Sequence, residues 1–373
     1  MAITAQSVAE LCLSAREASR ALATLGTSTK DAALHAIADA LQARTGEILE
    51  ANARDVEAGR EAGLDAALLD RLALDADRVR AMADGVRAIA ALPDPVGEVI
   101  DGHRLPNGLD VRKVRVPLGV VAVVYEARPN VTIDAAALCL KSGNAIVLRG
   151  SSSASHSNAI LAGIAAQAAT QAGVPEGAIV LVAGGGREEL AELATQEGVV
   201  DLIVPRGGEG LKAALKGVAT VPVIYAASGN CHVFVDDSAD LDVAQRIVLN
   251  AKTQRPGVCN AAETLLVHAR VAPRFLARVL PALRDAGVEL RVDGRVHALS
   301  GDGLAGTVTD ASDEDWDTEF LSLVLAVGVV DSVAEAIDHV NAHGSGHSEA
   351  IVTSSAASAR AFELGVDAAC VYV

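Results

Sequence analysis

The sequence has 373 residues, of which 51% are hydrophobic and only 2% aromatic, and its formal net charge is -17. This charge argues against a nucleic acid or an anionic membrane as partner, because both need a concentrated positive field. Charges and glycines interrupt every apolar run well before the ~20 residues that span a bilayer, and residues 1–9 show no secretory signal. We therefore expect a cytoplasmic protein of about two or three domains.

The five cysteines are odd in number and show no Cys-x-x-Cys spacing. They predict reduced thiols, with neither a disulfide framework nor a zinc site. His343 and His347 form the nearest approach to a metal motif, but the glycines between them argue against a shared helix face. We expect no metal.

The first part of the chain is helical in pattern and then changes character. Residues 5–92 carry apolar positions at intervals of three and four, which predicts a helical cover. After the prolines at 93 and 95, residues 101–116 contain Asn107-Gly108, a signal for a two-residue hairpin turn, followed by alternating valine and basic residues. This hairpin is either a solvated surface ribbon or a flap that contacts another subunit.

From residue 116 onwards, short apolar runs alternate with helical patterns, which indicates a parallel sheet with helices on both faces. A ligand of such a sheet is expected at the carboxyl ends of its strands. The predicted strands are 120–126, 145–148, 179–182, 201–204 and 221–225, and the predicted helices are 131–141, 155–172, 188–195 and 209–216.

Two features of this region favour a dinucleotide. The predicted strand ending at residue 148 is followed by Arg149, Ser151 and Ser152. At this position, dinucleotide folds that prefer the unphosphorylated cofactor NAD often carry an acidic residue that binds the ribose hydroxyls. A 2′-phosphate suits this cation and these hydroxyls, so the cofactor prediction is NADP(H); the alternative for Arg149 is a surface charge at a strand end. The helix that begins near Gly207 and Gly208 offers free backbone N–H groups to a phosphate.

A second βα run predicts another domain. We expect one domain over 1–240 and a second over 241–373, with Cys259 at the edge of the second and the cofactor meeting the substrate between them. The predicted helices are 241–252, 273–286, 333–342 and 356–364, and the predicted strands are 263–268, 289–292, 323–330, 349–353 and 369–373.

Cys259 is the strongest candidate for chemistry. Pro256 and Gly257 place it outside regular structure, between a helix and a strand, where catalytic residues are common. Lys252 and Arg255 are close in sequence, and nearby cations would lower the pKa of the thiol and favour the nucleophilic thiolate. The alternative is a buried cysteine packed as a small apolar side chain.

Several long motifs then occur in order along the chain. They are Val124-Tyr-Glu-Ala-Arg-Pro-Asn-Val-Thr132, Lys141-Ser-Gly-Asn-Ala-Ile-Val-Leu-Arg-Gly150, Pro205-Arg-Gly-Gly208, Gly229-Asn-Cys-His-Val-Phe-Val-Asp236 and the Cys259 stretch. Together they resemble the gamma-glutamyl phosphate reductases, a family of the aldehyde dehydrogenase superfamily. The resemblance implies an α/β fold with a Rossmann-type cofactor domain, an α/β catalytic domain and a β-hairpin oligomerisation flap.

The resemblance also implies a reaction and residue roles. The reaction is NADPH-dependent reduction of L-glutamyl 5-phosphate to glutamate 5-semialdehyde and phosphate, the second step of proline synthesis from glutamate. It implies Cys259 as the nucleophile, Asn130 as an oxyanion donor and Glu319 as the acid that holds the nicotinamide-side ribose. Arg128 and Arg255 are predicted, less directly, to hold the leaving phosphate or the substrate carboxylate. The local alternatives are a helix N-cap for Asn130, a solvated charge for Glu319 and surface ion pairing for both arginines.

Two further features separate the alternatives. The segment 225–229 carries no carboxylate to activate water against a thioester, which favours the reductive direction. The family continues past the Val-Tyr-Val strand, so the second domain is expected to lack the family's C-terminal segment. The alternatives are another aldehyde or acyl-thioester dehydrogenase, or a truncated, inactive homologue acting as a binding partner. We also expect a homo-oligomer and a glutamate 5-kinase partner.

Overall fold

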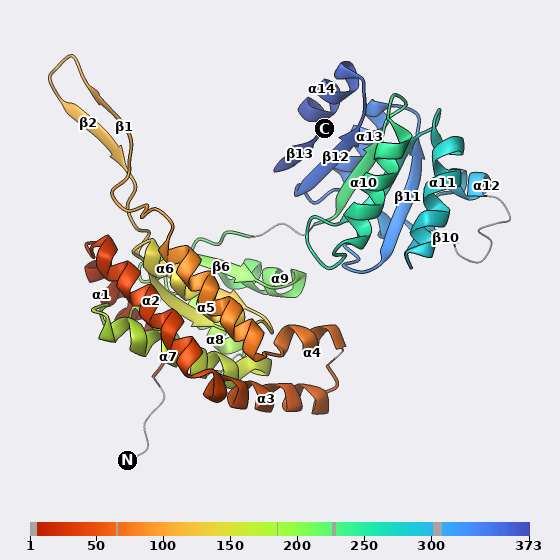
Figure 1. Ribbon diagram of the computed structural model, residues 1–373. Helices are drawn as coiled ribbons and strands as arrows, with labels where there is room; N and C mark the ends of the chain where they lie inside the picture. The colour runs from red at the N-terminus through yellow and green to blue at the C-terminus, as the bar shows by residue number, and fades with distance from the viewer. Residues whose placement is uncertain (1–5, 65, 185, 226–228, 301–307) are drawn as a thin grey trace. The chain divides into compact units, whose positions relative to one another are not determined.

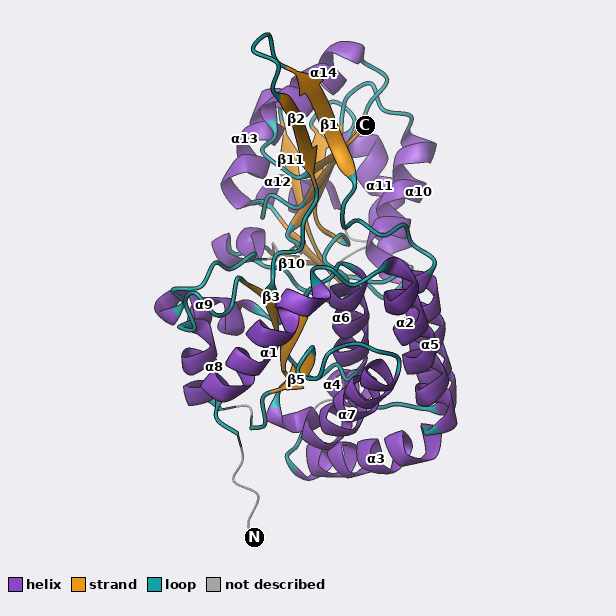
Figure 2. Cartoon of the chain, turned by 90° about the vertical axis from the view of Figure 1, so that its left-hand side faces the viewer, coloured by secondary structure: helices purple, strands orange, loops and turns teal. Residues whose placement is uncertain are grey.

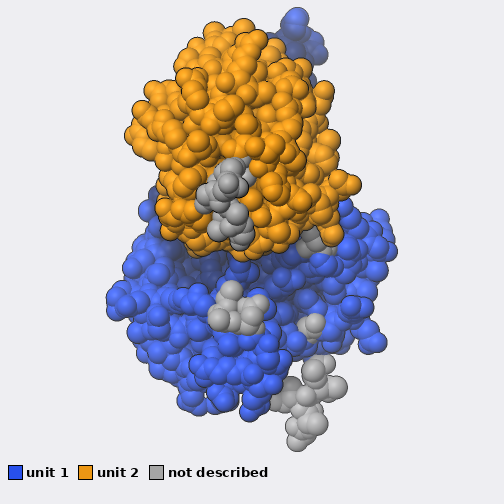
Figure 3. Space-filling view, turned by 90° about the vertical axis from the view of Figure 1, so that its right-hand side faces the viewer, with its two compact units in different colours: residues 1–226 blue, residues 227–373 orange. Residues whose placement is uncertain are grey.

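The computed structural model describes residues 6–64, 66–184, 186–225, 229–300 and 308–373. The chain forms two compact units, Met1–Ala226 and Ala227–Val373 (Figure 3). The predicted boundary lay at residue 240, so the segment that carries strand β7 belongs to the second unit. No helix among the described residues is long and apolar enough to cross a membrane.

Unit 1 begins with the predicted helical cover. Its helices are α1 (Val8–Leu22), α2 (Thr27–Ala43), α3 (Thr45–Glu61), α4 (Ala66–Leu72) and α5 (Ala76–Ala90). Helix α1 starts at a capping box, in which the Ser7 hydroxyl accepts from the Glu10 N–H and the Glu10 carboxylate accepts from the Ser7 N–H. The apolar stripes of α1, α2 and α5 enter the core of unit 1.

The hairpin consists of β1 (Val99–Arg104) and β2 (Asp110–Val114), which pair antiparallel and project away from the rest of unit 1 (Figure 1). Its turn differs from the predicted one. The Gly108 N–H donates to the Leu105 carbonyl (2.9 Å), so Pro106 and Asn107 occupy the centre of the turn. Gly108 follows at φ 88°, a left-handed conformation that glycine adopts at little cost. Strand β1 is exposed along its whole length.

The sheet of unit 1 is parallel, with strand order β5-β4-β3-β6. Helices α6 and α7 contact one side of this sheet, whereas α1, together with α8, covers the other (Figure 2). The strand order reverses between β3 and β6, and ligands of such sheets bind at the carboxyl ends of the strands beside this point. The strands are β3 (Val120–Tyr125), β4 (Ala145–Arg149), β5 (Ile179–Leu181) and β6 (Leu202–Arg206), and the helices are α6 (Asn130–Lys141), α7 (Ser155–Gln171), α8 (Arg187–Ala194) and α9 (Glu209–Val218).

The prediction of a strand over 221–225 is wrong. Only Val223 forms a parallel bridge, with Ile203 of β6. Pro222 lacks the N–H that would continue the ladder, and it contributes only its carbonyl, which accepts from the Ile203 N–H (2.8 Å).

Unit 2 contains a seven-stranded parallel sheet in the order β10-β9-β11-β8-β7-β12-β13. Helices α10, α11 and α12 pack over one apolar core and helices α13 and α14 over a second. The strands are β7 (Cys231–Val235), β8 (Ala262–His268), β9 (Glu289–Val292), β10 (Val308–Asp310), β11 (Val324–Val330), β12 (Ser348–Val352) and β13 (Cys370–Tyr372), and the helices are α10 (Leu241–Thr253), α11 (Ala272–Asp285), α12 (Gly294–Ser300), α13 (Val333–His343) and α14 (Ala356–Gly365).

Strand β7 was not predicted, although the motif that contains it, residues 229–236, was recognised. This strand is buried at every position, so it lacks the alternation of a half-buried strand. It lies between β8 and β12 and is therefore central to the sheet.

Candidate active site

Cys259 lies in the turn that links α10 to β8, and its side chain is exposed. Three other cysteines are buried, and burial raises the pKa of Cys12 to about 11 and the pKa values of Cys139 and Cys231 to about 12. These three thiols stay protonated at neutral pH. Cys370 is the second exposed cysteine, at the start of β13. The buried alternative for Cys259 is therefore wrong.

The loop before β7 lies against the backbone of Cys259. A Cβ atom built on Gly229 would lie 1.5 Å from the Cys259 carbonyl oxygen and 2.6 Å from its Cα. Only glycine allows this approach. The Cys231 thiol also donates to the Cys259 carbonyl (3.2 Å). Two residues far from Cys259 in sequence thus set the position of its main chain.

Glu319, the predicted ribose ligand, lies on the same edge of unit 2. The Gly229 N–H donates to the Glu319 Oε1 (2.7 Å), so this carboxylate belongs to the same cluster as the Cys259 turn. Asn230 is 3% exposed, and its Nδ2 donates to the carbonyls of Trp316 (2.6 Å) and His343 (2.7 Å). Sequence reasoning missed Gly229 and Asn230 as site residues, because neither carries a reactive group.

These residues share one structural origin. Gly229 precedes β7, Cys259 precedes β8 and Glu319 precedes β11, and these three strands are neighbours in the order β11-β8-β7. Because all three strands run parallel, their amino ends lie at the same edge of the sheet. The site of unit 2 is therefore built from the loops that enter the strands.

Lys252 does not act as a cation beside the thiol. Its side chain is fully buried, and its Nζ lies 2.5 Å from the Glu263 Oε2, which is also fully buried. The helical geometry of α10 turns Lys252 inward, although it is only seven positions before Cys259 in the sequence. Arg255 is exposed in the turn and remains the candidate cation for the thiol.

Asn130 and Arg128 lie in unit 1, at the carboxyl end of β3. Pro129 occupies the cap position of α6 and Asn130 is its first residue, so the N-cap alternative for Asn130 is wrong. The Asn130 side chain is exposed, and its amide donates to the Asp134 carboxylate (3.0 Å). Arg128 is exposed in the bend before α6. The Asn130 side chain therefore does not cap α6.

The strand end at Arg149 is more buried than expected. Arg149 is 7% exposed and its Nη2 donates to the Gly186 carbonyl (2.7 Å), so it is not a surface charge. Burial lowers the pKa of Arg149, and the Glu189 carboxylate opposes this shift. Ser151 precedes a short 3₁₀ turn and Ser152 begins it; the Ser151 hydroxyl lies 2.5 Å from that of Ser153. The three residues form one corner between β4 and α7.

Gly207 and Gly208 lead into α9 at the carboxyl end of β6. The Gly208 N–H donates to the Glu126 carboxylate (3.2 Å), and Glu126 follows β3 directly. A carboxylate therefore already accepts from the helix N-terminus at the point where the strand order reverses. Sequence reasoning missed Glu126 because only the pairing of β3 with β6 brings it to Gly208.

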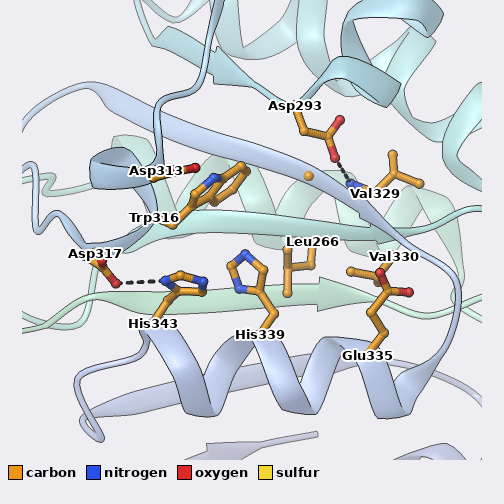
Figure 4. Close-up of a pocket in the computed structure, with 11 residues that line it drawn as sticks. Leu266, Asp293, Asp313, Trp316, Asp317, Val329, Val330, Glu335, His339 and His343 are labelled. Atoms are coloured by element: carbon orange, nitrogen blue, oxygen red, sulfur yellow. Dashed lines mark hydrogen bonds and ion pairs between the residues drawn. The ribbon is translucent and has the colours of Figure 1, made fainter.

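Unit 2 also contains a cavity of about 410 Å³, which none of the predicted site residues lines (Figure 4). Its walls carry His339 and His343 from α13, with Trp316 and Asp317 opposite them. The centroids of the His339 and His343 rings lie 4.6 Å apart, and the ring centroid of the fully buried His232 lies 5.4 Å from that of His339. His343 Nδ1 pairs with the Asp317 carboxylate (2.8 Å). His232, His339 and His343 thus form a histidine cluster.

The histidine cluster predicts that the stability of the protein falls in acid. Burial, followed by the neighbouring His232 and His343, lowers the pKa of His339 from 6.5 to about 4. Between these two values the unfolded chain binds more protons than the folded chain, so the free energy of unfolding falls as the pH is lowered from 6.5 towards 4. We expect His339→Gln to lose less stability than the wild type over this interval, measured by urea unfolding at pH 7.5, 5.5 and 4.5. Parallel pH profiles for the two proteins would contradict the prediction.

Comparisons with known proteins agree with this architecture. Residues 1–298 match the model of the aldehyde dehydrogenase family. The chain is 53% identical over 359 residues to the gamma-glutamyl phosphate reductase of Thermobifida fusca and 55% identical over 359 residues to that of Moorella thermoacetica. Each alignment covers 96% of this chain and 85% of the relative.

A solved structure supports the same assignment. The crystal structure of the gamma-glutamyl phosphate reductase from Thermotoga maritima matches with a TM-score of 0.95 at 42% identity, over 99% of this chain and 88% of that chain. The matched residues therefore include nearly all of the helices and strands described above. The chain therefore belongs to the aldehyde dehydrogenase family and, within it, to the gamma-glutamyl phosphate reductases, which are enzymes that act on small molecules.

Proposed function

We propose that this protein reduces L-glutamyl 5-phosphate to L-glutamate 5-semialdehyde and phosphate with NADPH, the second step of proline synthesis from glutamate. The observation that carries the proposal is the exposed Cys259 thiol, in a turn whose main chain contacts Gly229, the residue that also donates to the Glu319 carboxylate. The chain's relatives bear this activity in their names. The proposed location is the cytoplasm, whose reducing conditions suit five free thiols.

Cys259 is the nucleophile of the proposed mechanism. Its thiolate attacks the acyl carbon of the substrate, the bond between carbon and phosphate oxygen breaks, and inorganic phosphate leaves a thioester on Sγ. Asn130 and the backbone N–H of Cys259 are the proposed donors to the oxyanion, and one such donor is worth roughly 3 to 4 kcal/mol in the transition state. The exposed guanidinium groups of Arg128 and Arg255 suit the leaving phosphate and the substrate carboxylate.

Three features of unit 1 and one residue of unit 2 support the proposal of a dinucleotide. Unit 1 has the parallel sheet, the reversal of strand order and the α9 N-terminus of a nucleotide-binding fold. Gly207 and Gly208 would hold a phosphate there, in competition with the Glu126 carboxylate. Glu319 would accept from ribose hydroxyls. When bound, NADPH supplies the hydride that converts the thioester carbon to the aldehyde.

The preference for NADPH over NADH rests on the corner between β4 and α7. The partly exposed Ser151 and the exposed Ser152 can donate to a 2′-phosphate, and this corner contains a cation, Arg149, instead of an acid. The Arg149 Nη2 is engaged by the Gly186 carbonyl, so the serine hydroxyls are the more accessible donors. We therefore assign the preference for NADPH to Ser151 and Ser152.

The residue types of one segment favour reduction of the thioester over its hydrolysis. The segment 225–229 contains no acidic residue that could act as a base for hydrolysis. Release of the aldehyde returns Cys259 to its thiolate, whereas an oxidising member of the superfamily would need an activated water at that stage. The residues of this chain therefore favour the reductive direction.

The reverse reaction provides the test. NADP reduction is followed by absorbance with glutamate 5-semialdehyde as substrate, first with phosphate, then without it, and finally with arsenate in its place. We expect turnover that requires phosphate or arsenate. Turnover that ignores phosphate but requires coenzyme A, with acetaldehyde as substrate, would assign the chain to acyl-thioester chemistry instead. No turnover in a folded sample would favour the binding-partner alternative.

Two partners belong to the same proposal. The exposed β1–β2 hairpin, with Val99, Ile100 and Val114 at 43 to 53% exposure, is the proposed contact between subunits of a homo-oligomer. A glutamate 5-kinase is the proposed source of the unstable acyl phosphate.

A further inference from the structure

A buried ion pair joins the two elements that flank the Cys259 turn and has no role in the proposed mechanism. Lys252, in the last turn of α10, and Glu263, the second residue of β8, are both fully buried and lie 2.5 Å apart. They precede and follow the Cys259 turn. Buried ion pairs contribute little net stability, because desolvation offsets much of their attraction. Their presence on either side of the turn that carries the proposed nucleophile therefore calls for an explanation other than stability.

The second oxygen of Glu263 binds a different segment. Its Oε1 accepts from the Leu321 N–H (3.1 Å), and Leu321 lies two residues after Glu319. Among the described residues Leu321 is the one non-glycine residue with a positive φ, at 52°. A leucine in this conformation is strained, and such strain persists only where the surroundings hold it. The Glu263 carboxylate is the group that holds it here.

The turn at Leu321 sets the direction of the chain between Glu319 and β11. The segment 316–321 is held at three points: Trp316 by the Asn230 amide, Glu319 by the Gly229 N–H and Leu321 by Glu263. Gly229 and Asn230 lie in the loop that contacts Cys259, and Glu263 lies in β8, four residues after Cys259. Burial raises the pKa of Glu263 to about 7 and lowers the pKa of Lys252; the Lys252 ammonium limits the first shift and the Glu263 carboxylate limits the second.

We propose that Glu263, neutralised by Lys252, is a positioning residue that holds the strained Leu321 turn and thereby fixes the Glu319 carboxylate beside the Cys259 turn. The role of Glu319 as a cofactor ligand rests on the proposed function. Glu263 touches neither substrate nor cofactor and acts through the 316–321 segment alone. Glu263 thereby connects the Cys259 turn to the segment 316–321, which carries the proposed cofactor ligand Glu319.

Two double variants separate this role from a general contribution to packing. Lys252→Met/Glu263→Met removes both charges and the acceptor for the Leu321 N–H. Lys252→Met/Glu263→Gln also removes both charges but keeps a carbonyl oxygen as acceptor. As a control for the loss of any buried ion pair, Lys30→Met/Asp94→Asn removes a comparable pair in unit 1, whose Nζ and Oδ2 lie 2.5 Å apart.

The readouts are the dissociation constant of NADPH, from fluorescence titration without substrate, and the KM of NADPH compared with kcat. We expect the methionine variant to bind NADPH about tenfold more weakly than the glutamine variant, since only glutamine keeps an acceptor for the part-buried Leu321 N–H and a tenfold change corresponds to the loss of about one hydrogen bond. Equal dissociation constants for the two variants, whether both high or both low, would overturn the proposal. The control variant is expected to change the unfolding midpoint but not the NADPH affinity.

Hydrogen exchange on the wild-type protein tests the contact itself and does not depend on any variant folding. We expect the Leu321 amide to exchange at least tenfold more slowly than the amides of exposed loops, and more slowly again with NADPH. Exchange at the rate of an open loop would overturn the proposal. A slow Leu321 amide in a protein that does not bind NADPH would instead refute the proposed function and leave the Glu263 contact standing.

Discussion

Replacement of Cys259 by alanine is expected to abolish phosphate-dependent NADP reduction, with a loss of at least about 10⁴-fold in kcat. The reason is that no thioester can form without the thiolate, and no other exposed thiol lies in this turn. The loss should appear in kcat and not in the dissociation constant of NADPH, because the Cys259 side chain makes no part of the proposed dinucleotide site. Initial rates with glutamate 5-semialdehyde and phosphate measure it.

Cys370→Ala is the matched control, since Cys370 is the other exposed cysteine. It should retain wild-type turnover. Brief treatment of the native wild type with iodoacetamide should label Cys259 and Cys370 and spare the three buried thiols, and prior incubation with substrate should protect Cys259 alone. Turnover by Cys259→Ala above a tenth of the wild-type rate would refute the covalent mechanism.

Gly229→Ala is expected to lower kcat/KM by about 10² to 10³-fold, because a displacement of about 1 Å at a reacting group can cost 10²-fold. The new methyl group would lie 1.5 Å from the Cys259 carbonyl oxygen and 2.3 Å from its carbonyl carbon. Both atoms belong to the main chain, so no side-chain rotation can relieve the overlap. The Cys259 turn or the loop of Gly229 must move, and the Gly229 hydrogen bond to Glu319 moves with it.

Three measurements define this result: kcat/KM, the alkylation rate of Cys259, and the free energy of unfolding, which should fall by about 1 to 3 kcal/mol as in other overpacked sites. Gly163→Ala in α7 is the control, because a Cβ at Gly163 meets nothing within 4 Å. That substitution should leave activity unchanged and raise stability slightly, as expected for alanine in a helix. A Gly229→Ala protein with wild-type kcat/KM would show that the close approach is not required.

The glycine and asparagine that precede β7 show why the site could be predicted only in part. Cys259, Glu319 and Arg149 carry reactive or charged groups, and motif and position alone drew attention to them. Gly229, Asn230 and Glu263 contribute a close approach, two donated hydrogen bonds and a buried acceptor. Such contributions have no local signature, because each depends on a partner between 30 and 113 residues away in the sequence.

Lys252 shows the opposite error. Its proximity to Cys259 in the sequence suggested a charge beside the thiol, but the last turn of α10 directs it into the core and Glu263 neutralises it. Nearness in the sequence therefore suggested an electrostatic effect of Lys252 on the Cys259 thiol that the fold does not support. At the α9 N-terminus the glycines were recognised, whereas the carboxylate that already occupies it, Glu126, arrives from a different strand.

By itself, the sequence determined the helical cover, the hairpin, the βα alternation and the candidate nucleophile, because periodicity, turn residues and side-chain type act over a few residues. Only the tertiary structure decided which loops meet. In a parallel sheet the strand order is set by long-range packing, and the order β11-β8-β7 places the starts of three strands, and with them Glu319, Cys259 and Gly229, at one edge. The site therefore depends on contacts whose energy no local stretch of sequence contains.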